Sequence, residues 1–169
     1  MKNWIAVLLL TCCVICCALK LQGQTTYEVT SLPSAGGSSA GISINNRQWV
    51  AASSSSAGDT VMHATLWRDG VLTDLGTLGG THSSALWPVK NNNGRIAGVA
   101  ETGEPNPRGE IWSCGYFFPT ITHSICRGFV WEDGVMTPLG TLGGYNSFAA
   151  GMNDQGQVVG WAENDVEDP

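Results

Sequence analysis

The chain has 169 residues, a formal net charge of −6 and only 13% charged residues, together with 22 glycines and seven tryptophans. This acidic balance argues against binding to nucleic acid or to an anionic membrane surface, because both require clustered positive charge. The composition, and the lack of any sustained amphipathic helical period, indicate an all-β protein.

Residues 1–23 are predicted to be a signal peptide. A short positive start, Met1-Lys2-Asn3, precedes an unbroken apolar run over residues 5–19, which is too short to span a bilayer comfortably but is typical of a signal peptide. We therefore expect an exported protein, extracellular or on the cell surface, with no membrane span in its mature region. An uncleaved anchor, a periplasmic location and a lipid anchor on a leader cysteine are the alternatives.

The mature region, residues 24–169, is expected to consist of internal repeats. The heptapeptide DLGTLGG at residues 74–80 returns 64 residues later as PLGTLGG at residues 138–144. The sequences on both sides of it also repeat, and a weaker copy begins at Gly36-Gly37. Agreement at several spaced positions in the same order predicts a repeat architecture.

Each repeat is predicted to fold into four short antiparallel strands. Asp69-Gly70 and Asp133-Gly134 lie between apolar runs and predict two-residue hairpins, because glycine accepts a positive φ and aspartate tolerates it. The Gly-Thr-Leu-Gly-Gly segment is interpreted as the connector between successive sheets. In chain order we expect first a lone outer strand at residues 27–32 and then two sets of four strands. The second set lies at about residues 85–89, 95–100, 128–131 and 135–139. A final pair of strands is expected at residues 148–153 and 158–163.

The copies recur every 43 to 46 residues, which is the period of four-stranded propeller blades. The predicted fold is therefore an all-β, β-propeller-like array of four-stranded antiparallel blades, with a β-solenoid as the alternative. About two and a half blades are too few to close a ring. We expect an incomplete ring, which is either a piece of a longer repeat protein or associates with itself through its open sheet edges.

One repeat carries an insertion of about 18 residues, near residues 101–124. Insertions in repeat proteins usually form loops on one rim, where partners often bind. The predicted binding-loop residues are the aromatic ones, Trp112, Tyr116, Phe117 and Phe118. The alternative is a loop that folds on its own aromatic side chains.

Cys114 and Cys126 are the only cysteines that follow the signal peptide. Both belong to the insertion or its end, and an exported protein meets an oxidising compartment. We therefore predict a disulfide bond between them that closes the inserted loop.

No catalytic, cofactor-binding or metal-binding residue is predicted. His63, His82 and His123 do not pair at metal-ligand spacing, and each is expected at the surface or in a turn. Backbone capping explains the turn aspartates, because no calcium-loop pattern accompanies them. The glycine-rich heptapeptide lacks the Gly-Lys-Ser/Thr and the helix of a phosphate-binding loop.

The segments HATLWRDGVLTDLGTLGG and RGFVWEDGVMTPLGTLGGYNSFAAGMNDQGQVVG resemble the HAF-repeat family of bacterial extracellular proteins. The resemblance covers about residues 36–163 and implies export and a repeat-built β fold, but it brings no activity with it. The His-Ala-Phe tripeptide that names the family is imperfect here, since residues 63–65 are His-Ala-Thr and residues 127–129 are Arg-Gly-Phe.

Two functions are consistent with these patterns. The favoured one is a secreted or surface-exposed, non-enzymatic module that binds a glycan or a protein through its rim. The alternative is a fragment of a secreted propeller-type hydrolase. Propeller enzymes gather acidic or metal-binding residues at the central channel, whereas the inner-strand positions of this chain carry small and aliphatic residues, which favours binding.

Overall fold

The computed structural model describes residues 26–166, except residues 86, 88–90 and 111, so the predicted signal peptide lies outside the described residues. The chain divides into two units, Met1–Ser31 and Leu32–Pro169. Residues 26–31 of the first unit contain no helix or strand. All the strands described below belong to the second unit, and within the described residues no helix has the length and apolar character needed to cross a membrane.

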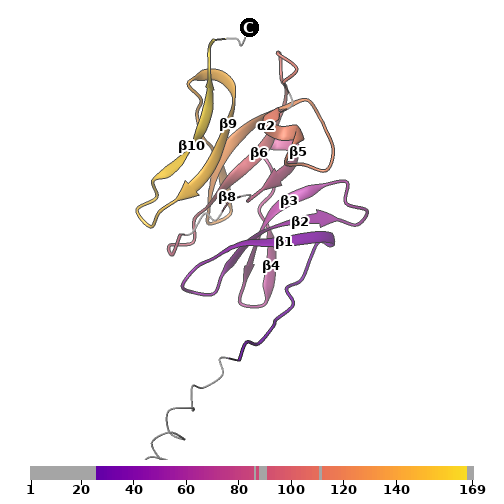
Figure 1. Ribbon diagram of the computed structural model, residues 1–169, viewed down its shortest axis with the longest axis vertical. Helices are drawn as coiled ribbons and strands as arrows, with labels where there is room; N and C mark the ends of the chain where they lie inside the picture. The colour runs from indigo at the N-terminus through magenta and orange to yellow at the C-terminus, as the bar shows by residue number, and fades with distance from the viewer. Residues whose placement is uncertain (1–25, 86, 88–90, 111, 167–169) are drawn as a thin grey trace, which may run out of the picture. The chain divides into compact units, whose positions relative to one another are not determined.

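Three antiparallel sheets, of four, four and two strands, make up the second unit (Figure 1). The strands are, in the first sheet, β1 (Gly36–Ile44), β2 (Val50–Ser56), β3 (Met62–Arg68) and β4 (Val71–Asp74); in the second, β5 (Gly79–Ser84), β6 (Ile96–Pro105), β7 (Ser124–Glu132) and β8 (Val135–Pro138); and in the third, β9 (Gly143–Met152) and β10 (Val158–Asn164). Neighbours in each sheet are consecutive in the chain, and no sheet closes on itself. The predicted all-β class is confirmed, and the described residues contain one short helix, α2 (Trp112–Gly115), between β6 and β7.

The two predicted hairpins form as expected. Asp69 and Gly70 have φ angles of 52° and 85°, and Asp133 and Gly134 have 48° and 90°. Two consecutive positive φ angles are the requirement of the tight hairpin turn that matches the twist of the flanking strands. The turns therefore pair β3 with β4 and β7 with β8 without any slip in register.

The repeated Gly-Gly pair begins the first strand of each sheet. Gly36, Gly79 and Gly143 start β1, β5 and β9, with φ angles of 110°, 110° and 115°. The next glycine lies against the second strand: a Cβ on Gly80 would be 2.5 Å from Glu101 Cβ and 2.5 Å from the Thr102 carbonyl oxygen. Positive φ in one position and close strand approach in the next explain why both must be glycine.

This placement corrects two sequence predictions. The first strand of the second sheet is β5, Gly79–Ser84, because the glycine pair is part of the strand and not a connector that precedes it. Most of the range predicted for this strand, residues 85–89, lies outside the described residues. Residues 27–32 form no strand, so the described strands number ten and not eleven. A strand keeps its extended conformation through hydrogen bonds to a partner strand, and residues 27–32 belong to none of the three sheets.

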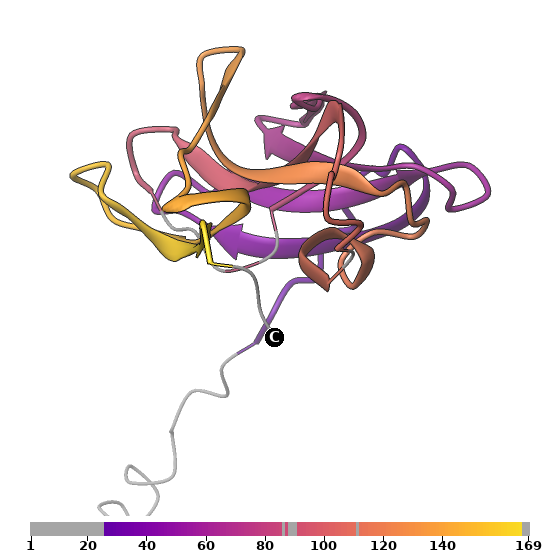
Figure 2. The ribbon, with the colours of Figure 1, turned by 90° about the horizontal axis from the view of Figure 1, so that it is seen from above.

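Consecutive sheets pack on each other, with β3 against β5 and β7 against β9. The core between them contains small residues beside a few large ones, including Ala64, Leu75, Phe129 and Trp131. The asparagine turn at residues 91–95 precedes β6, and the insertion follows β6. The turn and the insertion therefore lie at opposite ends of this strand. Figure 2 shows α2 well apart from the corresponding yellow turn between β9 and β10.

Candidate functional site

The insertion between β6 and β7 is tied to the second sheet by its two cysteines. The sulfur atoms of Cys114, in α2, and Cys126, in β7, lie within disulfide-bonding distance, and their Cα atoms are 6.0 Å apart. Both residues are buried. The pairing predicted from the sequence is therefore the one that the geometry brings together.

The aromatic residues of the insertion divide into packed and exposed ones. Phe118 is buried and stacks on the His82 ring, with 5.2 Å between the ring centroids. Phe117 packs at 5.2 Å against Phe148, which is buried in the third sheet. Tyr116, in contrast, is 81% exposed. The backbone of Trp112 begins α2, and its side chain lies outside what the structure describes.

Phe117 and Phe118 thus fix the inserted loop to the sheets, as the alternative interpretation of these side chains expected. Tyr116 is the predicted binding residue whose described side chain faces solvent. A loop that is held by two packed phenylalanines and a cysteine pair presents this tyrosine in a fixed position.

His82 is buried at the junction of β3, β5 and the insertion. Its Nδ1 accepts a hydrogen bond from the Met62 amide at 3.2 Å, and its Nε2 lies 2.6 Å from the Thr120 hydroxyl. Because Nδ1 accepts, the ring is neutral and Nε2 carries the proton. Burial lowers the pKa of His82 below its usual 6.5, Glu101 opposes this change and His63 adds to it. The sequence prediction of a surface or turn position for His82 is wrong.

Glu101 and its repeat counterpart Glu163 cap the first strands of their sheets, a role that the sequence reasoning missed. Glu101 is fully buried, and one of its oxygens accepts the amides of Thr81 and His82, each at 3.0 Å. Glu163 accepts the corresponding amides of Tyr145 and Asn146, at 3.1 and 2.9 Å. The shared Ala-Glu dipeptide at residues 100–101 and 162–163 was the signal that could have revealed this pair.

His63 is engaged on both ring nitrogens. Nδ1 lies 2.7 Å from an Asp74 carboxylate oxygen, and Nε2 lies 3.2 Å from the Thr81 carbonyl oxygen. This arrangement joins β3, β4 and β5. Both nitrogens of the ring are therefore occupied by structural partners. His123 is exposed in the loop before β7, with a φ of 57°.

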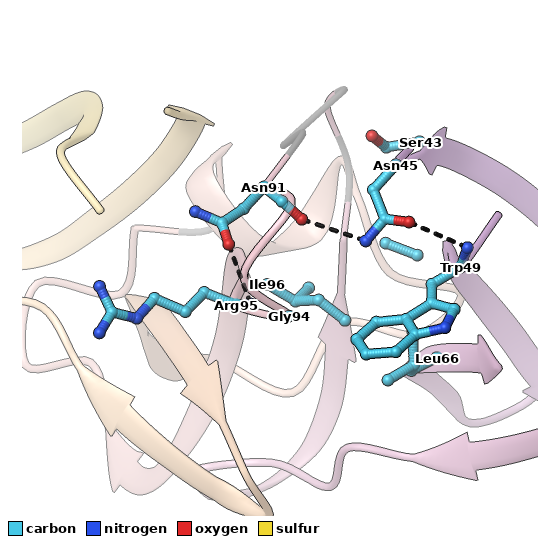
Figure 3. A pocket seen from close by; sticks show the side chains of 9 residues that line it. Ser43, Asn45, Trp49, Leu66, Asn91, Gly94, Arg95 and Ile96 are labelled. Carbon is cyan, nitrogen blue, oxygen red and sulfur yellow. Dashed lines mark hydrogen bonds between the residues drawn. The ribbon is translucent and has the colours of Figure 1, made fainter. Parts of the chain in front are cut away.

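At the other end of the strands, three asparagine turns stack from sheet to sheet. The Asn45 side chain donates to the Asn91 carbonyl at 3.2 Å, and the Asn91 side chain donates to the Asn153 carbonyl at 2.7 Å. Within each turn, the asparagine oxygen accepts two amides of its own loop, as for Arg47 and Trp49 around Asn45. Figure 3 shows the first step of this stack.

The pocket in Figure 3 lies at this turn stack, between Trp49, which immediately precedes β2, and Ile96 of β6. The Trp49 ring covers Gly94, where an added Cβ would lie 3.1 Å from a ring carbon. The guanidinium groups of Arg47 and Arg68 lie 5.2 and 5.1 Å from the centre of the same ring. The contact of Trp49 with Gly94 joins two sheets, and the side chains of Asn45 and Asn91 at the pocket's edge already hold backbone partners.

No three His, Cys, Asp or Glu side chains of the described residues gather as a metal site would require. A scan against protein-family models, a search of curated proteins and a search of solved structures found no match to the chain.

Proposed function

We propose that this chain is an exported, non-enzymatic binding module of the HAF-repeat type, built as an incomplete β-propeller-like array. Its ligand is a glycan or a protein, and its location is extracellular or on the cell surface. The observation that carries the proposal is the fixed presentation of Tyr116, which is 81% exposed on a loop held by packed phenylalanines and a cysteine pair.

The physical support is the cost of ordering a binding residue. An aromatic side chain on a preorganised loop loses little conformational entropy when a ligand binds, and it offers a large contact area with a polar end. Aromatic residues also provide stacking faces for apolar groups of ligands. The buried ionisable groups His82 and Glu101 also fit a non-enzymatic role. Their polar atoms hold backbone amides and a hydroxyl, so these atoms serve the structure.

The test is an array of glycans and candidate proteins probed with the purified exported protein, run beside a broad hydrolase screen. We expect a saturable ligand whose affinity falls at least about tenfold with Tyr116→Ala. Tyr27→Ala is the matched control, since Tyr27 is 87% exposed and lies outside the insertion. Turnover of a substrate in the screen, or equal binding by the two variants, would contradict the proposal.

A further inference from the structure

Strand β10 has a position in its sheet that corresponds to β2 and β6. Those two strands lie in the interior of four-stranded sheets, where β3 and β7 pair with their second edges. β10 pairs with β9 on one side and with no further strand among the described residues. The two complete sheets therefore show which strand pairs with the second edge of a strand in this position.

The second and third strands pair in the same register in both complete sheets. Val50 of β2 faces Trp67 of β3, and Ile96 of β6 faces Trp131 of β7. The repeat aligns Val158 of β10 with these two positions. A third strand added to β10 in the same register would place an indole opposite Val158.

Exposure along β10 shows that its apolar residues lack the cover that the other sheets provide. Val159 is 67% exposed, whereas Ala97, its counterpart in β6, is fully buried. Leu142 is 73% exposed in the segment that precedes β9. Val159 and Leu142 line a solvent-open groove of about 490 Å³, here called the β10 groove, together with Leu139, Gly160, Trp161 and others.

The glycine in β10 indicates which side chain belongs in this groove. In the second sheet, Phe129 is fully buried opposite Gly98, where an added Cβ would meet the Ser84 carbonyl oxygen of β5 and would lie 2.9 Å from the Phe129 ring. In the first sheet, the corresponding pair is Ala52 with the smaller Thr65. The third strand thus has a large ring opposite the glycine and a small side chain opposite the alanine, although an added Cβ on Gly98 or Gly160 would also meet a carbonyl oxygen of the first strand. Gly160 is the counterpart of Gly98.

We propose that the free edge of β10 binds an antiparallel β-strand of a different protein, and not of a second copy of this chain, with an aromatic residue opposite Gly160 and a tryptophan opposite Val158. The backbone of such a strand completes the open edge, as in other cases of β-strand addition, and its aromatic ring fills the β10 groove. This site is independent of Tyr116, so it stands or falls separately from the function proposed above.

The probe is a synthetic peptide that copies residues 124–138, with Cys126→Ser and a fluorophore at its amino end. We expect saturable one-to-one binding to the purified protein, measured by fluorescence anisotropy. A peptide with Phe129→Thr, which copies the first sheet, should bind at least about tenfold more weakly. Hydrogen exchange of the β10 amides should slow only when the first peptide is bound.

The matched protein variants are Val159→Lys and Val135→Lys, because these valines are 67% and 64% exposed in strands β10 and β8. Peptide binding should be lost in the first variant and kept in the second, with unchanged circular dichroism in both. Failure of the first peptide to bind at about 1 mM, or equal binding of the peptide with Phe129→Thr, would overturn the proposal. A peptide-free dimer that Val159→Lys dissociates would also overturn it, since a second copy would then occupy the edge.

Discussion

Removing the Glu101 carboxylate should destabilise the second sheet more than any comparable change on the surface. Glu101→Ala leaves the amides of Thr81 and His82 without their acceptor, and the His82 amide is buried. Each buried donor that loses its acceptor costs about 1–3 kcal/mol. Since the Thr81 amide is only partly buried, we expect a total loss of about 3 kcal/mol in the free energy of unfolding.

Glu163→Ala provides the internal control for this prediction. It removes the same contacts to Tyr145 and Asn146, but Glu163 is half-buried beside the open edge, where water can replace it. We expect a loss of about 1 kcal/mol. Urea unfolding followed by tryptophan fluorescence measures both values. Equal losses in the two variants, or a loss below about 1 kcal/mol for Glu101→Ala, would refute the argument that burial makes this cap important.

Three further predictions follow from single contacts. Thiol titration of the native protein should find no free sulfhydryl at Cys114 or Cys126, and reduction should lower the free energy of unfolding by about 3 kcal/mol, since the bond closes a short loop. Two free thiols would disprove the bond. Burial lowers the pKa of His82 in the folded state, so the unfolded state binds the His82 proton at a higher pH than the folded state does. The free energy of unfolding should therefore be full above about pH 6.5 and fall below it. His82→Gln should flatten this dependence, and an unchanged profile would show that another group is responsible. Gly80→Ala should cost about 1–3 kcal/mol through overpacking against β6, whereas Gly140→Ala, which has open space around its Cα, should cost less than about 0.5 kcal/mol.

The sequence was informative wherever the structure depends on backbone conformation. Asp69-Gly70 and Asp133-Gly134 predicted their hairpins because only a few residue types accept two positive φ angles in succession. The Gly-Gly pair was recognised as special but placed outside the strands. Its second glycine is required by the closeness of the neighbouring strand, as at Gly80, and a sequence contains no direct record of how near two strands lie.

Contacts between sheets could be predicted less well. His82 was expected at the surface or in a turn because it has no partner at metal-ligand spacing in the sequence, yet its environment comes from Met62, Phe118 and Thr120. Those residues are brought to it by sheet packing and by the inserted loop. The aromatic residues of the insertion were visible in the sequence, but which of them pack and which face solvent depends on the same packing.

Hydrogen bonds at the junctions between sheets link the sheets into one array. The amides of Ala64 and Gly128, each in the third strand of its sheet, donate to the hydroxyls of Ser83 and Ser147 in the next sheet, at 2.9 and 3.1 Å. The asparagine turns repeat the same kind of link at the other end of the strands. In repeat architectures, stability is close to a sum of the intrinsic stabilities of the repeats and such nearest-neighbour terms. Within the described residues, the second sheet has two junctions, whereas the first and third each have one. The third sheet also has only two strands, so its local opening should cost less free energy than that of the other two sheets. A strand bound along β10 would therefore stabilise the least stable of the three sheets.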